Sequence, residues 1–168
     1  MKIKHLFFLL KACLLIAFQV LIFNNMYLLR YATPYPYVVL LLFLPISSSN
    51  GKTTFIAGIV GLIIDILQGM PGVHTAAFTL LGFLRNYLLV PFIDPETDRS
   101  KSVSYQAIRG KVFVYLLLLV LIHHFTFFIL EAAASFNFRY FLLRLFSSVG
   151  ITYFISLLFL LLGREKKS

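Results

Sequence analysis

A single acidic side chain lies inside the apolar segments of this sequence. Asp65 falls within a run from Thr53 to Leu67, whereas the other acidic residues lie outside every such run. A carboxylate is costly in a nonpolar medium, so an intramembrane Asp is by default a functional or structural polar group that needs a partner. The competing interpretation is that Asp65 sits at a helix end and extends its side chain to water.

Two arginines, Arg85 and Arg144, are the candidate partners of Asp65. Counting from the ends of the predicted spans offsets Arg85 from Asp65 by roughly 8 to 12 Å, at about 1.5 Å per residue, which is more than an arginine side chain comfortably bridges. Arg144 lies closer to the depth of Asp65. We therefore predict that Asp65 pairs with Arg144, or that it shares a hydrogen-bond network with His123 or His124.

The adjacent histidines His123 and His124 are the other residues that could do chemistry. On a regular helix they point about 100° apart, so they cannot both bind one metal ion, and no HExxH motif is present. Buried, hydrogen-bonded neutral histidines are therefore favoured over a metal site. The sequence also has no G-x-S-x-G motif and no paired intramembrane carboxylates, so we expect no catalytic residues, no metal and no cofactor.

Small residues share one face of the segment that contains the carboxylate. Ala57, Gly61 and Asp65 are spaced four residues apart, and Gly58 adjoins them. Small residues at this spacing let another helix approach closely in lipid. The face predicts either ordinary packing within a helix bundle or a docking surface for a partner helix, and both interpretations stay open.

The composition requires that these residues sit in lipid. The chain has 168 residues, of which 60% are hydrophobic and 12% charged, and its mean hydropathy is +0.92. A soluble domain is about half apolar and one quarter charged. The net charge of +9 is scattered between apolar runs and forms no basic face, so nucleic-acid binding has little support. Cys13 is the only cysteine, which excludes an internal disulfide and a thiolate metal site.

Six apolar runs predict an all-α integral membrane protein, a bundle of about six transmembrane helices that forms one domain over residues 1–168. The expected spans are 6–23, 35–46, 53–67, 75–92, 112–130 and 140–162. The first follows a charged start like that of a signal peptide, but it is too long and no cleavage site follows, so we interpret it as a retained helix. The second is short and flanked by prolines, so it either borrows flanking residues or is a broken helix.

The cations indicate the orientation, because short cytoplasmic loops carry an excess of Lys and Arg. With six spans and a cytoplasmic start, the inner side holds eleven cations, and the outer side holds only Arg30 and Arg139. This count favours an even number of crossings, with both termini in the cytoplasm. Tyrosines cluster around the first outer loop, and we expect this loop to lie in the headgroup region of the bilayer. These tyrosines are Tyr27, Tyr31, Tyr35 and Tyr37.

Three short motifs resemble the family of the bacterial rod shape-determining protein MreD. They are Gly61-Leu62-Ile63-Ile64-Asp65, Gly69-Met70-Pro71-Gly72-Val73-His74 and Gly82-Phe83-Leu84-Arg85. In that family a Gly-Leu-x-x-Asp helix end is followed by a Pro and Gly turn and by a second helix that runs on to Gly-x-Leu. Here Pro71 and Gly72 are adjacent, whereas many members have a residue between them. The stretch from Tyr31 to Pro34 looks like the variants found in Bacteroidetes-type bacteria.

The resemblance implies a non-enzymatic protein of the bacterial inner membrane that binds the bitopic protein MreC. Its further partners would be the RodA glycosyltransferase, a penicillin-binding transpeptidase and MreB filaments, in the machinery of lateral peptidoglycan synthesis and cell shape. A homodimer stays open. By transfer, Gly61, Asp65, Pro71 and Gly72 shape the hairpin. The full set of candidate structural or partner-docking residues is Ala57, Gly58, Gly61, Asp65, Pro71, Gly72, Gly82, Arg85 and Arg144.

The main alternative is a substrate-binding membrane subunit of a vitamin or metal importer of the energy-coupling-factor type, whose six-helix architecture is thought to be similar to that of the MreD family. Those subunits typically dock through Ala-x-x-x-Ala in the first span, whereas Ala12 and Ala17 here are five residues apart. The third interpretation is a generic membrane assembly factor without a ligand, which differs only in its partner.

Overall fold

Helices account for the regular structure of the chain. The computed structural model describes residues 2–26, 31–134 and 136–162. Within those ranges no strand is present, although Pro45 and Ser102 form an isolated antiparallel bridge. The α-helices are α1 (Lys2–Leu21), α2 (Leu40–Phe43), α3 (Asn50–Gln68), α4 (Val73–Leu89), α5 (Tyr105–Ile108), α6 (Lys111–Glu131) and α7 (Phe138–Leu162). The 3-10 turns are η1 (Phe23–Asn25), η2 (Pro36–Val39), η3 (Val90–Phe92) and η4 (Ala132–Ala134).

Among the residues that the structure describes, four helices are long and apolar enough to cross a membrane. They are α3, α4 extended by η3, α6 and α7, and a shorter apolar helix covers Leu6–Leu21. This agrees with the predicted all-helical, multi-span membrane protein. The bounds predicted for the third to sixth spans lie within three residues of the observed ends. The largest difference is at α3, which begins at Asn50 because the Ser49 side chain accepts a hydrogen bond from the Lys52 N–H and caps the helix there.

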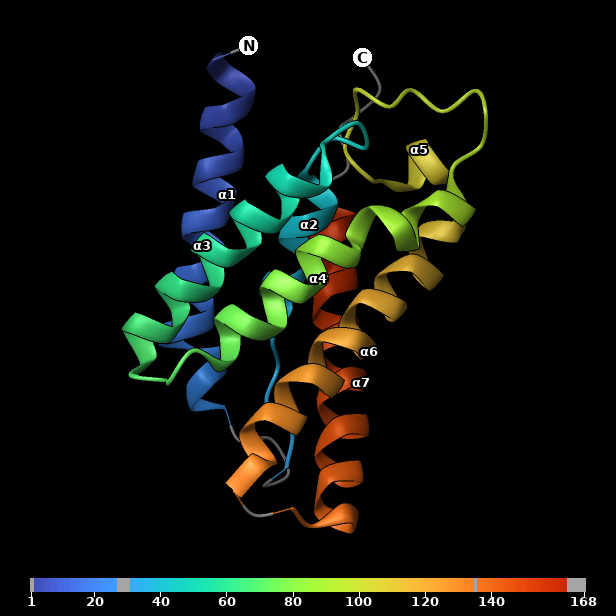
Figure 1. Ribbon diagram of the computed structural model, residues 1–168. Coiled ribbons are helices and arrows are strands. Elements are labelled where there is room, and N and C mark those ends of the chain that lie inside the picture. The colour runs from blue at the N-terminus through green and yellow to red at the C-terminus, as the bar shows by residue number, and fades with distance from the viewer. Residues whose placement is uncertain (1, 27–30, 135, 163–168) are drawn as a thin grey trace.

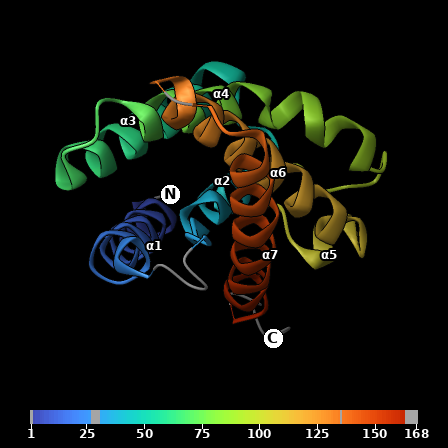
Figure 2. The same cartoon turned by 90° about the horizontal axis from the view of Figure 1, so that it is seen from below.

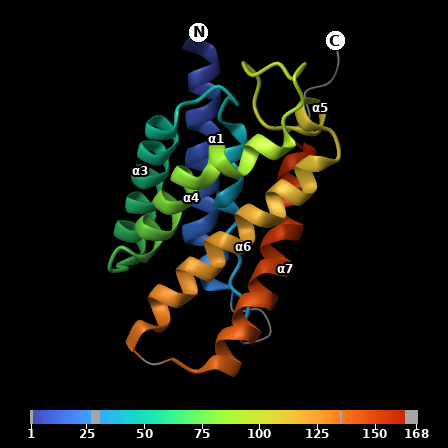
Figure 3. The same ribbon diagram turned by 45° about the vertical axis from the view of Figure 1, so that its right-hand side comes forward.

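The two described ends of the chain lie at the same end of the bundle. In Figures 1 and 3, α1 starts and α7 finishes at the end that carries α5, and the α6–α7 connection lies at the opposite end. The polar loop between α4 and α6 is fixed to the segment before α3. Ile46 N–H donates to Lys101 O at 2.9 Å, and Ser47 N–H donates to Arg99 O at 2.8 Å.

The second predicted span is a broken helix that forms the centre of the bundle. Every residue from 32 to 42 is buried, and Figure 2 shows α2 lying between α1 and α7, beneath the α3–α4 pair. Prolines explain the break. Pro36 occupies the start of η2, and Pro45 follows the end of α2, where no helix can continue. Of the two alternatives for this run, the structure therefore has the broken one.

Side chains of α7 satisfy the backbone of this central segment. Thr33 N–H donates to Ser148 Oγ at 3.0 Å, and Tyr35 N–H donates to Thr152 Oγ1 at 2.9 Å. Ser148 and Thr152 are one turn apart on α7, and both are 0% exposed. Irregular backbone is tolerated at membrane depth only where protein surrounds it and supplies its hydrogen bonds. The hydroxyl face of α7 thus makes the non-helical entry to η2 possible.

Two of the four tyrosines around the predicted outer loop lie inside the protein and do not face lipid headgroups. Tyr35 and Tyr37 are 4% and 0% exposed, because the proline-containing segment that carries them turns into the core. Tyr31 is 38% exposed and packs edge to face on Tyr140, with 5.8 Å between ring centroids. Tyr27 lies outside the described residues.

Candidate functional site

Asp65 caps the helix that follows its own. Two left-handed glycines, Gly69 with φ 64° and Gly72 with φ 88°, turn the chain between α3 and α4. The Asp65 carboxylate, 3% exposed, then accepts hydrogen bonds from His74 N–H at 3.1 Å and Thr75 N–H at 2.7 Å. The Thr75 hydroxyl donates a third, at 2.6 Å. A carboxylate at a helix N-terminus satisfies free N–H groups and faces the positive end of the helix dipole, a role that glycine at the N-cap cannot fill.

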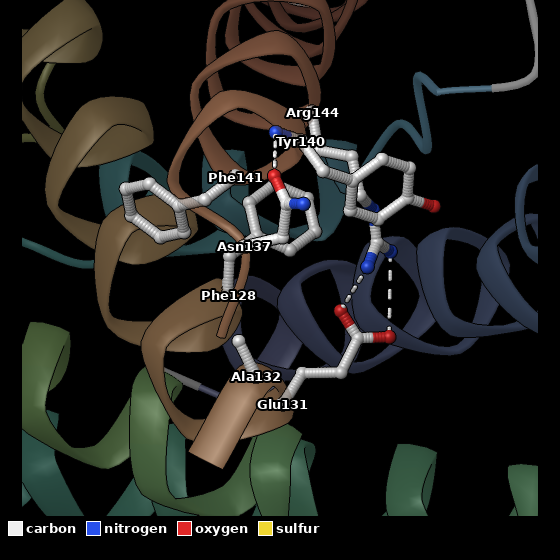
Figure 4. Close-up of a pocket in the computed structure, with 7 residues that line it drawn as sticks. All are labelled: Phe128, Glu131, Ala132, Asn137, Tyr140, Phe141 and Arg144. Carbon is white, nitrogen blue, oxygen red and sulfur yellow. Dashed lines mark hydrogen bonds and ion pairs between the residues drawn. The ribbon is translucent and has the colours of Figure 1, made fainter. Parts of the chain in front are cut away.

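The predicted pair of Asp65 and Arg144 is wrong. Arg144 binds Glu131, with Nη1 and Nη2 lying 2.5 Å and 3.3 Å from its two carboxylate oxygens (Figure 4). Asp65 takes its donors from nine and ten residues along the chain. Counting depth failed because it compared only charged side chains and ignored the free backbone N–H groups at the start of α4. The side-chain hydrogen bonds of His123 and His124 go to other residues, so neither joins Asp65 directly.

The small residues of α3 and α4 pack against each other within the hairpin. A Cβ added to Gly61 would lie 2.7 Å from the Thr75 Cα, and one added to Gly82 would lie 2.6 Å from the Ala57 Cβ. Gly58 would bring a Cβ to 3.2 Å from a threonine hydroxyl of α4. Both close approaches need glycine, because a side chain would have to displace the facing helix. The small-residue face of α3 therefore packs inside the bundle, against α4, and is not a free docking surface for a partner helix.

Arg85 lies at the other end of the same hairpin, far from the Asp65 cap. It is 0% exposed. Its Nε donates to Leu41 O at 2.9 Å, and its Nη2 donates to Leu44 O at 2.7 Å and to Pro45 O at 3.2 Å. These carbonyls belong to the C-terminal end of the broken central helix, which is the negative end of its dipole. Arg85 therefore holds α4 to the central segment through backbone carbonyls.

Tyr37 connects the central segment to two histidines. Its hydroxyl oxygen lies 2.9 Å from His74 Nδ1 and 2.7 Å from His123 Nε2. Gln68 Oε1 lies 2.9 Å from His74 Nε2. With that amide oxygen as the acceptor, His74 donates from Nε2, Tyr37 donates to His74 and His123 donates to Tyr37. The hydrogen-bond chain therefore ties α6 through the central segment to the α3–α4 hairpin.

His124 begins a second hydrogen-bond chain. Its Nδ1 lies 2.8 Å from Val120 O and its Nε2 lies 2.9 Å from Thr152 Oγ1, so with the proton on Nδ1 the ring donates to the carbonyl and accepts from the hydroxyl. Thr152 in turn accepts the Tyr35 N–H. Because His123 and His124 are both 0% exposed, the prediction of buried, hydrogen-bonded histidines is confirmed. Over the described ranges, no group of three His, Cys, Asp or Glu side chains is placed to hold a metal ion.

A pocket of about 180 Å³ opens between the end of α6 and the start of α7 (Figure 4). Arg144 and Glu131 form its charged wall, and their side chains are 17% and 33% exposed. The guanidinium carbon lies 4.5 Å from the ring centre of Phe128 and 5.6 Å from that of Tyr140. Asn137 also lines the pocket, and its Oδ1 accepts the Tyr140 N–H at 3.0 Å. Two opposite charges and several aromatic rings thus meet in one small opening.

The loop between α4 and α6 carries three of the six acidic residues, Asp94, Glu96 and Asp98. Lys111 Nζ lies 2.6 Å from Asp94 Oδ1, and this hydrogen bond, reinforced by the positive charge, lowers the pKa of Asp94 below its ordinary value. The Ser100 hydroxyl and N–H, which both donate to Asp98, lower the pKa of that carboxyl. Both carboxylates are exposed, so they order the loop and have little influence on the bundle.

Sequence reasoning did not identify the hydroxyl residues of α7 or the bridging role of Tyr37. A signal for the first was present, because Ser148, Thr152 and Ser156 recur every four residues in an apolar run. Such a stripe predicts a polar helix face turned toward the bundle interior. For Tyr37 no local pattern existed, since its partners His74 and His123 are 37 and 86 residues away.

Comparisons with known proteins do not extend these observations. No family model matches this chain, and no curated protein or solved structure matches it. The sequence motifs and the geometry of the hairpin and the pocket are therefore what bears on the function of this chain.

Proposed function

We propose that this chain is a non-enzymatic membrane component of a bacterial cell-elongation complex, of the MreD type, that binds a bitopic MreC-like protein. One observation carries the proposal. The motif residues Gly61, Asp65, Gly72 and Gly82 come together in the α3–α4 hairpin, where each has its own packing, turning or capping role. Motif residues that depend on one another form a structural unit, which favours a family relationship over chance similarity between apolar sequences.

The hairpin has the properties of a platform for one further membrane helix. The inner face of α3 packs on α4 through the glycine contacts, which hold the two helices firmly together. The outer face of α3 carries a stripe of large, exposed apolar side chains. These are Phe55 (69% exposed), Ile59 (42%), Leu62 (50%) and Ile66 (70%). Membrane helices associate by side-chain packing on such a preformed surface, because lipid provides no hydrophobic driving force between them. In this proposal the transmembrane helix of the bitopic partner packs along that stripe.

The proposal places the chain in the inner membrane as a six-pass protein with both termini in the cytoplasm. The central segment runs back toward the end where α1 begins (Figure 1), so it supplies the crossing that the long helices alone do not. That end also carries Lys52 at the start of α3 and the basic loop before α6, whereas Arg139 lies at the opposite end. The excess of cations at one end supports a cytoplasmic location for it. Regulation of lateral peptidoglycan synthesis would follow through the partner's contacts with RodA, the penicillin-binding transpeptidase and MreB filaments.

Site-specific crosslinking tests the proposed contact. A photo-crosslinking residue at Leu62, on the outer stripe of α3, should capture the MreC-like protein in cells. The same residue at Leu158 on α7, which is 46% exposed, should not. Depletion of the chain from a rod-shaped host should give round, swelling cells. Capture of the partner from neither position, or unchanged cell width on depletion, would contradict the proposal.

The importer subunit stays the alternative. The pocket between α6 and α7 measures about 180 Å³, and a second pocket along the later half of α1 measures about 280 Å³, whereas sites for drug-sized molecules have volumes of roughly 300–1,000 Å³. A vitamin would therefore need a larger opening than either of these two. A panel of vitamins and metal ions in a thermal-shift assay on the purified chain separates the two functions, because a large and specific shift would favour import.

A further inference from the structure

The pocket between α6 and α7 opens at one end of a helix that is long enough to cross a membrane. α6 has 21 residues, which gives a length of about 31 Å, close to a hydrocarbon core about 30 Å thick. In the proposed six-pass arrangement, on which this inference rests, Glu131 ends the helix near the boundary of the core. Exposed aromatic side chains surround the same end, with Phe136 61%, Phe138 65% and Tyr140 46% exposed. Of these, Tyr140 is of the type that is enriched at the interface between hydrocarbon and headgroups.

Both charges of the pocket can bind a further group while they stay paired. A guanidinium has five N–H donors, and two bonds join Arg144 to Glu131, so donors remain for an anion. The Glu131 carboxylate likewise has more lone pairs than these bonds use. The rings of Phe128 and Tyr140 hold the guanidinium in place, which reduces the entropy lost when an anion binds.

We propose that this pocket binds the phosphoethanolamine headgroup of a membrane lipid, with the phosphate on Arg144 and the ammonium on Glu131. A phosphate accepts the forked N–H donors of arginine, and a primary ammonium donates hydrogen bonds to a carboxylate. An anionic headgroup would fill only the arginine side and would meet the negative charge of Glu131. A quaternary ammonium has no N–H to donate. The pocket chemistry thus ranks phosphatidylethanolamine above phosphatidylcholine, and phosphatidylcholine above phosphatidylglycerol.

The location of the pocket selects a lipid over the free phosphate ester. Apolar rings, including that of Phe141, line the wall beside the charges, and the hydrocarbon boundary lies next to it. A lipid headgroup is held at this depth by its acyl chains, so its local concentration is high without strong binding. Free phosphoethanolamine has no such anchor.

Native mass spectrometry of the purified full chain tests the proposal, with the three phospholipids offered at matched acyl composition. We expect the wild-type chain to retain phosphatidylethanolamine about two- to fivefold over phosphatidylglycerol, as a partly exposed charge pair provides. Glu131→Gln, which keeps the shape of the side chain, should abolish that preference. Asp94→Asn, which neutralises the exposed carboxylate of the opposite end, should leave it unchanged.

Three results would overturn the proposal. The first is equal retention of the three lipids by the wild-type chain, a measurement that does not depend on whether any variant folds. The second is an unchanged preference in a folded Glu131→Gln variant. The third is displacement of the lipid by equimolar free phosphoethanolamine, which would show that a soluble phosphate ester is the ligand. This test is independent of the proposed partner, because neither Arg144 nor Glu131 belongs to the hairpin.

Discussion

Replacement of Asp65 by alanine is the sharpest test of the helix-capping geometry. The change leaves the N–H groups of His74 and Thr75 without their acceptor at 3.1 Å and 2.7 Å, in a site where Asp65 is 3% exposed. Each buried donor without a partner costs about 1–3 kcal/mol, and part of this is offset because no carboxylate has to be desolvated. We expect a net loss of about 3 kcal/mol of unfolding free energy. Asp65→Asn keeps one acceptor and should lose about half as much.

The assay is reversible unfolding of the purified chain in mixed micelles, followed by far-ultraviolet circular dichroism. The matched control is Asp98→Ala, which removes an exposed carboxylate hydrogen-bonded to Ser100 and should change the unfolding free energy by less than about 0.5 kcal/mol. A double-mutant cycle adds Thr75→Val, which deletes the hydroxyl that donates to Asp65 at 2.6 Å. The two changes should be coupled by about 1–2 kcal/mol. Equal losses from Asp65→Ala and Asp98→Ala, or no coupling with Thr75, would refute the capping role.

Three further predictions concern other parts of the bundle. Gly61→Ala should destabilise the chain by about 1–3 kcal/mol, because its new Cβ meets backbone at 2.7 Å, whereas Gly150→Ala on open α7 surface should be neutral or stabilising in the same unfolding assay. Arg85→Lys should lower the unfolding free energy by about 2–3 kcal/mol, since an ammonium cannot reproduce the forked donation of the guanidinium to the carbonyls. Arg85→Gln should not restore the wild-type stability either. Lys111 lowers the pKa of Asp94, so the contribution of the Asp94 carboxylate to loop order should be complete above about pH 4 and lost as the pH falls through the folded pKa. Hydrogen exchange of the loop amides measures this loss. Asp94→Asn should remove the pH dependence of that exchange.

Hydropathy was sufficient for the long helices because their solvent is lipid. The runs at 112–130 and 140–162 predict α6 and α7 nearly to the residue, since an uninterrupted apolar stretch can satisfy its backbone only as a helix. Because prolines flank residues 35–46, the same reasoning gave a broken helix as one of two alternatives there. Hydropathy could not indicate which side chains would hydrogen-bond the free backbone groups of that segment. Thr33 and Ser148 are 115 residues apart, and no local pattern links them.

Sequence reasoning reached furthest where interacting residues lie close together along the chain. Gly61 and Asp65 lie on one face with a glycine turn following, and this is enough to predict a tight hairpin. Arg144 was assigned to the wrong partner because depth along a helix fixes one coordinate of a side chain and leaves its direction around the axis open. Glu131, its true partner, lies just past the predicted end of the fifth span, where a boundary error of one residue excluded it from the candidates.

Some charged side chains of this bundle satisfy free backbone N–H or C=O groups at helix ends, and others do not. Asp65 serves the N-terminal N–H groups of α4, and Arg85 serves the carbonyls that end α2, so each charge matches the sign of the helix end it meets. Their hydrogen bonds are committed to the fold, and a ligand could take them only by uncapping a helix. Arg144 and Glu131 differ, because through their side chains they bind each other and, within the described residues, no helix terminus. An intramembrane charge should therefore be assigned a ligand only after its backbone contacts are known, and by that criterion the α6–α7 pocket is the site within the described bundle that we propose for a charged ligand.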